Sequence, residues 1–237
     1  MTDLFASEAN TTLRTTDHRD FPVARVFCVG RNYAAHAREM GKDPDRDPPF
    51  YFTKWPETVR NSAPEDDLEI PYPPETGNFH HEAELVVAIG QAGFRISEDA
   101  APDHVCGYAV GLDMTRRDLQ LEAREKGRPW DTGKNVADSC PTGRLQLVED
   151  AGHLSAGRIH LTVNGDTRQD ADVSELIWSV PEIIADLSKY YALRPGDLIY
   201  TGTPAGVGPV ASGDEIVCTI AGLPDLRVRI GAPFGQG

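Results

Sequence analysis

The sequence lacks long apolar runs and has comparatively few basic residues, and each shortage excludes a class of protein. No stretch approaches the roughly 18 apolar residues that a membrane-spanning helix requires, and the first residues are polar rather than arranged as a signal peptide. Lys and Arg number 23 against 37 Asp and Glu, which gives a net charge of -14. Because nucleic acids and anionic membrane surfaces are bound through clustered Lys and Arg, we expect neither partner.

Cysteine is also scarce. The four cysteines, Cys28, Cys106, Cys140 and Cys218, stand far apart and form no C-x-x-C pair. Cys28, Cys106 and Cys218 lie in apolar, strand-like runs, which is typical of reduced core residues rather than of a disulfide framework. We therefore expect a cytoplasmic location, where thiols stay reduced.

Short strand-like runs outnumber helical segments, and Gly and Pro separate them. We expect residues 1–20 to form a polar N-terminal arm and residues 21–237 to form a single domain. Because helices do not alternate with strands, the pattern favours an α+β fold that is mainly β, with mixed sheets, over a doubly wound parallel sheet. Helices are predicted at Asn32–Met40, Thr115–Lys126 and Ser179–Tyr191. Strands are predicted at Val23–Gly30, Phe50–Lys54, His80–Ile89, Val105–Asp113, Arg158–Val163, Asp166–Val173, Leu198–Thr201, Asp214–Ile220 and Leu226–Ile230.

The sharpest candidate site is the string HHEAE, which precedes the apolar run LVVAI. Side chains alternate along a strand, so Glu82 and Glu84 share one face. Asp113 ends another apolar strand, where a charge is otherwise unfavourable. Three carboxylates completed by water suit Mg²⁺ or Mn²⁺. Two alternatives remain open, namely an edge strand with an outward acidic face and a zinc site that uses His80 and His81.

Three further segments carry polar residues at useful spacings. His36 and Glu39 are three apart on a predicted helix, where a carboxylate can orient an imidazole as a general base; an exposed surface pair is the alternative. Arg117 and Gln120 are also three apart, and Lys134 follows in a Gly-containing loop, where a solvated lysine is the ordinary case. The string TGTPAGVGPV lacks the phosphate-loop pattern, and its glycines either let backbone amides approach a carboxylate or only form a tight turn.

Taken together and in this order, these segments resemble the fumarylacetoacetate hydrolase family. The resemblance runs from about Phe21 to Ile230. The segment Phe21–Tyr33, FPVARVFCVGRNY, is most similar to small bacterial members that hydrolyse fumarylpyruvate and related acylpyruvates. The resemblance implies the family's mixed β-sheet roll with a few short helices, usually paired as a homodimer. It is carried by the strings GRNYAAHAREMG, HHEAELVVAIG, GYAVGLDMTRRDLQ, PWDTGKN and YTGTPAGVGPV.

The resemblance also implies a metal site. Glu82, Glu84 and Asp113 match the metal-binding acids, and Mg²⁺ is the expected cofactor, with Mn²⁺ or Ca²⁺ as substitutes. Some relatives carry a fourth acidic ligand where this chain has Val29, so we expect a further water in that position.

Catalytic and substrate-binding roles follow from the same resemblance. His36 and Glu39 match a water-activating pair, on a segment that in relatives orders over the substrate as a lid. Lys134 matches the active-site lysine. We further expect a distal substrate carboxylate to be held by Arg31 or Arg38. The positions that match substrate contacts are Arg117, Gln120 and Thr203.

The expected reaction is therefore metal-dependent hydrolysis of a carbon–carbon bond in a small 2,4-dioxo acid, an acylpyruvate. Fumarylpyruvate, which would give fumarate and pyruvate, is the expected substrate. Two reactions on the same metal site are alternatives, namely decarboxylation of oxaloacetate and isomerisation or hydration of a 2-hydroxy dienoate. A non-catalytic ligand-binding protein is the remaining alternative, and the set of His36, Glu39 and Lys134 argues against it.

Overall fold

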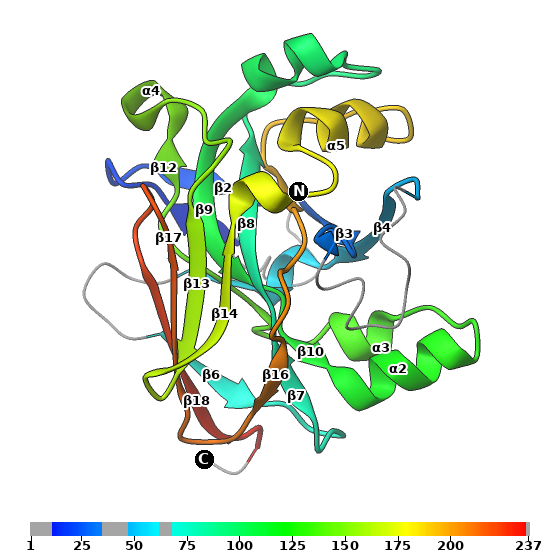
Figure 1. The fold of residues 1–237 in the computed structure, drawn as a ribbon, viewed down its shortest axis with the longest axis vertical. Helices are drawn as coiled ribbons and strands as arrows, with labels where there is room; N and C mark the ends of the chain where they lie inside the picture. Colours follow the sequence, from blue (N-terminus) through cyan, green and yellow to red (C-terminus); the bar gives the residue numbers. More distant parts are fainter. Residues whose placement is uncertain (1–10, 35–46, 62–67, 236–237) are drawn as a thin grey trace, which may run out of the picture.

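The computed structural model describes residues 11–34, 47–61 and 68–235. Strands in these ranges form four sheets, and the helices between them are short (Figure 1). The predicted α+β class, mainly β with mixed sheets, is confirmed. Within the same ranges no helix is both long and apolar enough to cross a bilayer.

The largest sheet runs through the middle of the molecule. The order across the sheet is β4 (Phe50–Lys54), β3 (Arg25–Gly30), β15 (Asp197–Tyr200), β8 (Ala83–Ile89), β9 (Val105–Leu112), β11 (Cys140–Thr142) and β5 (Val59–Asn61). A short strand, β12 (Gln146–Leu147), also pairs with β9. Neighbouring strands are mostly antiparallel, but β3 pairs with β15 and β5 pairs with β11 in parallel, so the sheet is mixed.

A second sheet of five strands packs across the first. The predicted hairpin is confirmed here, because Asn164 and Gly165 have φ of 54° and 86°, as a two-residue hairpin turn requires. The order is β14 (Asp166–Asp172), β13 (Arg158–Val163), β17 (Glu215–Ile220), β18 (Leu226–Pro233) and β6 (Leu68–Tyr72). A smaller sheet joins β10 (Thr115–Arg116), β7 (Phe79–His81) and β16 (Gly208–Val210).

Two apolar clusters form the core. The larger one fills the space between the two main sheets and contains buried side chains from β8, β9, β13 and β17. The smaller one lies against the other side of the central sheet and contains Val26, Cys28 and Tyr200. Leu13 joins this smaller cluster from a hairpin of β1 (Thr12–Arg14) and β2 (Asp20–Pro22), and its side chain is 0% exposed.

The helices lie outside the sheets. Among the described residues the longest are α2 (Arg117–Glu125) and α5 (Val180–Leu187), and α3 (Asp131–Lys134) and α4 (Val148–Ala151) are single turns. The same part of the chain contains 3-10 helices at Pro56–Thr58, Glu98–His104 and Val173–Glu175. In Figure 1, α2 and α3 lie together on one side of the molecule, away from α5.

The start of α5 agrees with the sequence, but its predicted end is wrong. Glu182 accepts hydrogen bonds from the backbone N–H and the hydroxyl of Ser179 at 2.9 and 2.8 Å, as the predicted capping arrangement requires. The prediction extended the helix to Tyr191, whereas it ends at Leu187. The carbonyl of Ser188 accepts from the N–H of Arg95 instead of continuing the helix, because the 93–96 segment crosses the helix end.

Two predicted boundaries beside the candidate site are also wrong. The predicted strand His80–Ile89 is interrupted at Glu82, since β7 belongs to the three-stranded sheet and β8 to the central sheet. The helix predicted at Thr115–Lys126 begins only at Arg117, because Thr115 and Arg116 pair with β7 before α2 begins. Most of the predicted helix Asn32–Met40 lies outside the described residues.

The place of Leu13 in the smaller core cluster makes the N-terminal hairpin part of the folded unit. Leu13→Ala should lower the free energy of unfolding by about 2–5 kcal/mol, since it removes fully buried carbons and leaves a cavity. Chemical denaturation measures this change. The control Thr12→Ala, at an exposed neighbour in the same strand, should stay within about 0.5 kcal/mol of the wild type. Equal stabilities for the two variants would contradict the packing of this hairpin.

Candidate active site

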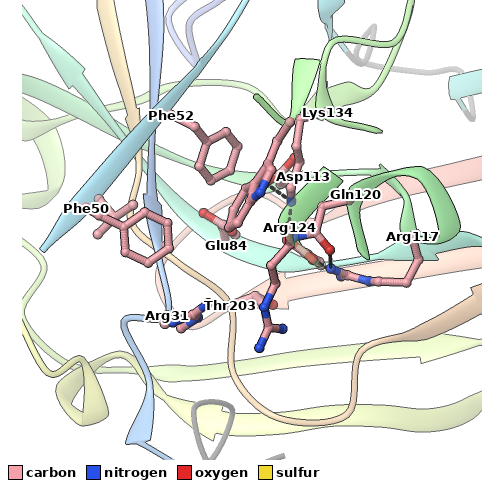
Figure 2. A pocket seen from close by; sticks show the side chains of 14 residues that line it. Arg31, Phe50, Phe52, Glu84, Asp113, Arg117, Gln120, Arg124, Lys134 and Thr203 are labelled. Carbon is pink, nitrogen blue, oxygen red and sulfur yellow. Dashed lines mark hydrogen bonds and ion pairs between the residues drawn. The ribbon is translucent and has the colours of Figure 1, made fainter. Parts of the chain in front are cut away.

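One cavity collects most of the residues that the sequence singled out (Figure 2). Of the ten predicted site residues, eight line it. The other two, His36 and Glu39, lie outside the described residues, as does Arg38. Val29 also lines the cavity and is almost fully buried. The complete lining is Val29, Gly30, Arg31, Phe50, Phe52, Glu82, Glu84, Asp113, Arg117, Gln120, Arg124, Trp130, Lys134 and Thr203.

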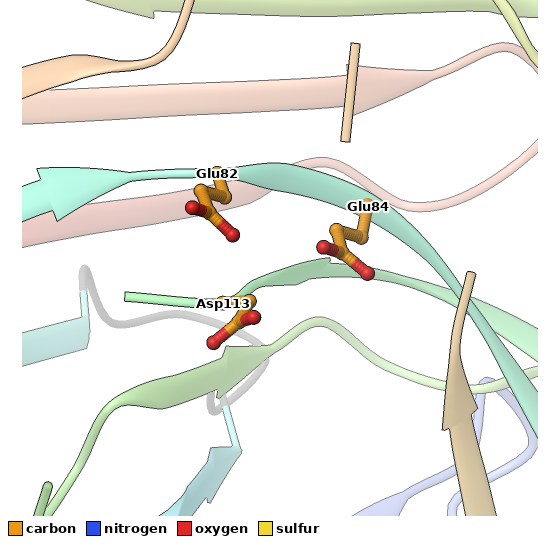
Figure 3. Close-up of side chains that lie close together, drawn as sticks. All are labelled: Glu82, Glu84 and Asp113. Carbon is orange, nitrogen blue, oxygen red and sulfur yellow. The ribbon is translucent and has the colours of Figure 1, made fainter. Parts of the chain in front are cut away.

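Two neighbouring strands bring the three acids together (Figure 3). Strands β8 and β9 run antiparallel with Ala83 opposite Leu112, so the start of one meets the end of the other. The backbone N–H of Asp113 donates to the carbonyl of Glu82 at 2.9 Å, which fixes this junction. Each acid offers one oxygen such that the three oxygens lie within 4.8 Å of one another. The predicted convergence from separate strands is therefore present.

The acids are buried, which rules out the alternative of an outward acidic face. Glu82, Glu84 and Asp113 are exposed by only 5%, 2% and 1%. Carboxylates removed from water in this way carry a large desolvation cost unless positive charge or hydrogen bonds compensate. The surroundings of each acid show how that cost is met.

Three buried cations contact two of the acids. Lys54 donates to Asp113 at 2.8 Å, and Lys134 donates to Asp113 at 2.7 Å and to Glu82 at 2.8 Å. Arg117 forms an ion pair with Glu82. All three cations are less than 10% exposed, so these pairs are poorly screened by water.

Glu84 differs from its two neighbours. Its carboxylate accepts a 2.7 Å hydrogen bond from the backbone N–H of Gly202, but within the described ranges no Lys or Arg forms an ion pair with it. Burial raises the pKa of Glu84 well above its ordinary value, and the negative charges of Asp113 and Glu82 raise it further. Gly202 has φ of 101°, a conformation that favours glycine, and this lets its N–H reach the carboxylate.

These features fit a hard divalent cation. The donors are all carboxylate oxygens, the ligand type that such ions prefer. Opposite ligands of Mg²⁺ stand about 4.2 Å apart, and those of Ca²⁺ about 5 Å, given metal–oxygen distances of 2.0–2.1 and 2.3–2.6 Å. The three oxygens lie within 4.8 Å of one another, a range that one such ion can span. A cation here would also relieve the repulsion around Glu84, for which the ion pairs of the neighbouring acids do not compensate.

The adjacent histidines do not converge with the three acids, so the structure does not support the zinc alternative. His80 hydrogen-bonds through Nε2 to the side-chain oxygen of Asn78 at 2.8 Å. His81 hydrogen-bonds through Nδ1 to Gln169 at 3.2 Å. Neither belongs to the group of side chains that converges on a common ion position.

Lys134 reaches the acids because α3 packs very closely on α2. A Cβ atom on Gly133 would lie 2.7 Å from Cβ of Gln120 and 2.8 Å from its backbone nitrogen, so only glycine permits this approach. Burial acts to lower the pKa of Lys134, but the charges of Asp113 and Glu82 act the other way and the pKa is raised. Lys134 is therefore held as an ammonium, a hydrogen-bond donor and positive charge rather than a base.

The other polar groups also present donors to the cavity. Arg117 can only donate, so its 3.0 Å hydrogen bond to Gln120 occupies the amide oxygen and leaves the amide nitrogen of Gln120 as the available donor. The same reasoning applies to Thr203. Gln169 accepts from the backbone N–H of Ala83 at 3.0 Å, so its amide nitrogen donates to the Thr203 hydroxyl oxygen at 2.7 Å. The Thr203 proton is then available to the cavity.

Three contributing residues were not predicted from the sequence. Lys54 gave a weak signal, as a charge at the end of an otherwise apolar strand. Gln169 lies in a strand so polar that the pattern gave no reason to expect a buried amide, yet it is 0% exposed. Arg124 stands four residues after Gln120 on the same helix face, so helical spacing alone gave a signal for it.

Comparison with known proteins shows the family to which this chain belongs. The profile described as Fumarylacetoacetate (FAA) hydrolase C-terminal matches residues 25–231. The chain belongs to the fumarylacetoacetate hydrolase family. The family resemblance read from the sequence is therefore confirmed, and so is the fold that it implied.

Individual relatives of the family cover nearly the whole chain. Fumarylpyruvate hydrolase from Ralstonia sp is 50% identical over 194 residues, which are 81% of this chain and 98% of the relative. A crystal structure of fumarylpyruvate hydrolase from Pseudomonas aeruginosa in complex with Mn²⁺ and pyruvate has a TM-score of 0.96 and 51% identity, and covers 98% of this chain and 100% of that one. Mitochondrial oxaloacetate tautomerase from Mus musculus is 43% identical over 205 residues, 86% of this chain and 90% of the relative.

If Glu84 helps to hold a divalent cation, removing its charge should reduce the stabilisation that the metal gives. Wild-type protein at a cation concentration 100 times the dissociation constant should gain about 2.7 kcal/mol in free energy of unfolding over chelated protein. Glu84→Gln should bind the cation at least roughly tenfold more weakly. Thermal unfolding with EDTA, Mg²⁺ or Mn²⁺ measures both. The exposed control Glu57→Gln should behave as wild type, and an unaltered metal response in Glu84→Gln would exclude this ligand.

The hydrogen bond between Gln169 and Thr203 should appear as an energetic coupling. Gln169→Leu should lower the free energy of unfolding by about 1–3 kcal/mol, because the N–H of Ala83 loses its acceptor. Thr203→Val should then cost about 1 kcal/mol less in the Gln169→Leu background than in the wild type. A double-mutant cycle from urea denaturation tests this, and strictly additive effects would argue against the bond.

Proposed function

We propose that this protein hydrolyses an acylpyruvate, fumarylpyruvate in particular, to a carboxylic acid and pyruvate. The observation that carries the proposal is one cavity in which three buried carboxylates with the chemistry of a divalent-metal site face the donors of Lys134, Gln120 and Thr203. The relatives from Ralstonia and Pseudomonas aeruginosa, both fumarylpyruvate hydrolases about half identical to this chain, support the choice of substrate.

The charge of the cavity supports a dianionic ligand. The three acids are matched by three cations, Lys54, Lys134 and Arg117. A divalent cation would therefore leave the inner cavity with two excess positive charges. A 2,4-dioxo acid carries a carboxylate and can place a second negative charge on its enolised oxygens, which restores neutrality in a site where imbalance is costly.

The side chains of this cavity can act on the C4 carbonyl of such a substrate. Attack of water at C4 forms a carbon–oxygen bond and puts negative charge on the carbonyl oxygen. The ammonium of Lys134 and the amide nitrogen of Gln120 are the donors that would stabilise this charge, and both are fixed by buried partners before reaction. The C3–C4 bond then breaks, pyruvate leaves as its enolate, and the proton lost by water is restored at C3.

The cofactor proposed for this site is Mg²⁺, with Mn²⁺ or Ca²⁺ as substitutes, held by Glu82, Glu84 and Asp113. When bound, it would supply a Lewis acid for the pyruvyl oxygens. Removal of the proton from water is assigned to His36, oriented by Glu39. This assignment rests on the sequence, because both residues lie outside the described ranges.

A second reaction is favoured by a specific observation. The oxaloacetate tautomerase from Mus musculus is 43% identical to this chain over most of its length. Tautomerisation needs only a proton transfer between C3 and the C2 oxygen, with no water and no broken carbon–carbon bond. The same buried donors could serve it. Hydrolysis and tautomerisation therefore differ in their products and in their need for the water-activating pair assigned to His36 and Glu39.

Two properties of the whole molecule are proposed alongside. A cytoplasmic location is supported by the free thiols of all four cysteines, since disulfides are rare in that compartment. A homodimer is supported by the exposed aromatic side chains Phe94, Tyr190 and Tyr191, because large exposed apolar groups are typical of interfaces.

Product analysis with fumarylpyruvate and with oxaloacetate tests the proposal. In the presence of Mg²⁺ or Mn²⁺, fumarylpyruvate should lose its enol absorbance while fumarate and pyruvate appear in equal amounts. Ketonisation of oxaloacetate without formation of pyruvate from fumarylpyruvate would instead support the tautomerase and contradict the hydrolase.

The same assay can measure the contribution of Lys134 to the rate of hydrolysis. Lys134→Gln keeps a hydrogen-bond donor but removes the charge, so kcat for fumarylpyruvate should fall about 10²–10³-fold, the usual cost of losing one oxyanion donor. Lys126→Gln is the matched control, since Lys126 is exposed and pairs with Glu122 near the end of α2. Near-normal kcat in Lys134→Gln would remove this residue from the mechanism.

A further inference from the structure

Two arginines line the cavity without belonging to its inner set of charges. Arg31 follows β3, and Arg124 lies on α2 one turn beyond Gln120, so that Arg117, Gln120 and Arg124 form one stripe of the helix. Figure 2 shows Arg124 extending beside Gln120, with its guanidinium directed toward the part of the cavity where Arg31 and Thr203 lie. Both arginines are only half-buried.

These two cations lack the compensation that the inner cations have. Within residues 11–34, 47–61 and 68–235, neither guanidinium forms an ion pair with a carboxylate. Burial lowers the pKa of Arg31, and the positive charge of Arg124 lowers it further, while Asp47 acts in the opposite direction from beyond ion-pair distance. Two like charges brought to one cavity favour binding of an anion between them.

Arg31 is held in place for such a role. Its guanidinium carbon lies 5.3 Å from the ring centroid of Phe50, a cation–π contact. Its backbone has φ of 56°, which is unusual for a residue with a side chain and marks a position fixed by its surroundings.

Aromatic side chains line the cavity between the acids and these arginines. Trp130 has its ring centroid 5.7 Å from that of Phe50 and 5.6 Å from that of Phe52. The ring of Phe52 lies 4.9 Å from the ammonium of Lys134 at the inner end, and Phe50 lies against Arg31 at the other. The flat, apolar lining suits an unsaturated carbon chain that connects two polar ends.

We infer that Arg31 and Arg124 together bind a second carboxylate at the distal end of the acyl group, and thereby select dicarboxylic acylpyruvates over acylpyruvates with a neutral acyl end. The inference rests on the proposed hydrolysis of acylpyruvates and assigns its substrate selectivity to two named residues. Bidentate geometry and permanent charge make guanidinium groups well suited to a carboxylate.

The test compares kcat/KM for fumarylpyruvate with kcat/KM for acetylpyruvate, which shares the reacting atoms but has no distal carboxylate. In Arg124→Gln the ratio of the two values should fall roughly 10- to 100-fold, with the acetylpyruvate value nearly unchanged. Arg31→Gln should act in the same direction. Arg128→Gln is the control, since Arg128 lies four residues further along, is exposed, and does not line this cavity, so it removes an equal charge without a contact.

Binding of fumarate, measured by calorimetry, gives a readout independent of turnover. Its affinity should weaken in Arg124→Gln but not in Arg128→Gln. Turnover of both acids with an unchanged ratio in Arg124→Gln would overturn the inference and leave the proposed hydrolysis intact. If the wild type turns over neither acid, the proposed hydrolysis is overturned. If, in addition, fumarate binds equally well to the wild type and to Arg124→Gln, the proposed carboxylate site is overturned as well.

Discussion

Three carboxylates buried within a few ångströms of one another are the constraint on which the rest of this site depends. Left to themselves they would repel one another and lose hydration, at a cost of several kcal/mol for each charge. Lys54, Lys134 and Arg117 balance Glu82 and Asp113, whereas within the described ranges Glu84 forms no ion pair and accepts a backbone N–H from Gly202. A protein that keeps this arrangement has a use for the unbalanced carboxylate, and a divalent cation is the ligand that its chemistry fits.

The fold supplies this arrangement through strand ends rather than through strand interiors. The junction of β8 and β9 fixes two acids by backbone pairing, and the break at Glu82 lets that residue turn between two sheets. Gln169 ties the same junction to the loop that carries Thr203, because its amide bonds to Ala83 on one side and to Thr203 on the other. Backbone hydrogen bonds and one buried amide therefore set the direction in which the polar groups face.

The sequence was informative where charge conflicts with its local surroundings. Glu82, Glu84 and Asp113 border apolar runs, and such positions are costly for acids unless they have a ligand. Lys54 and Gln169 could not be assigned in the same way, because their partners are distant in sequence: Lys54 lies 59 residues from Asp113 and Gln169 lies 86 residues from Ala83. The end of α5 was missed for a similar reason, since the Arg95 N–H that binds the carbonyl of Ser188 comes from a segment distant in sequence.

The cavity thus combines two kinds of positive charge that do different work. The inner cations are matched by protein carboxylates, so they fix geometry and contribute little net field at the cavity mouth. Arg31 and Arg124 are unmatched within the described ranges, and their field extends to whatever enters. The reaction requires hydrogen-bond donors whose positions do not depend on the substrate. The inner cations, Lys54, Lys134 and Arg117, provide them. Discrimination between acyl groups requires positive charge that only a substrate with a distal carboxylate neutralises. Arg31 and Arg124 provide this charge.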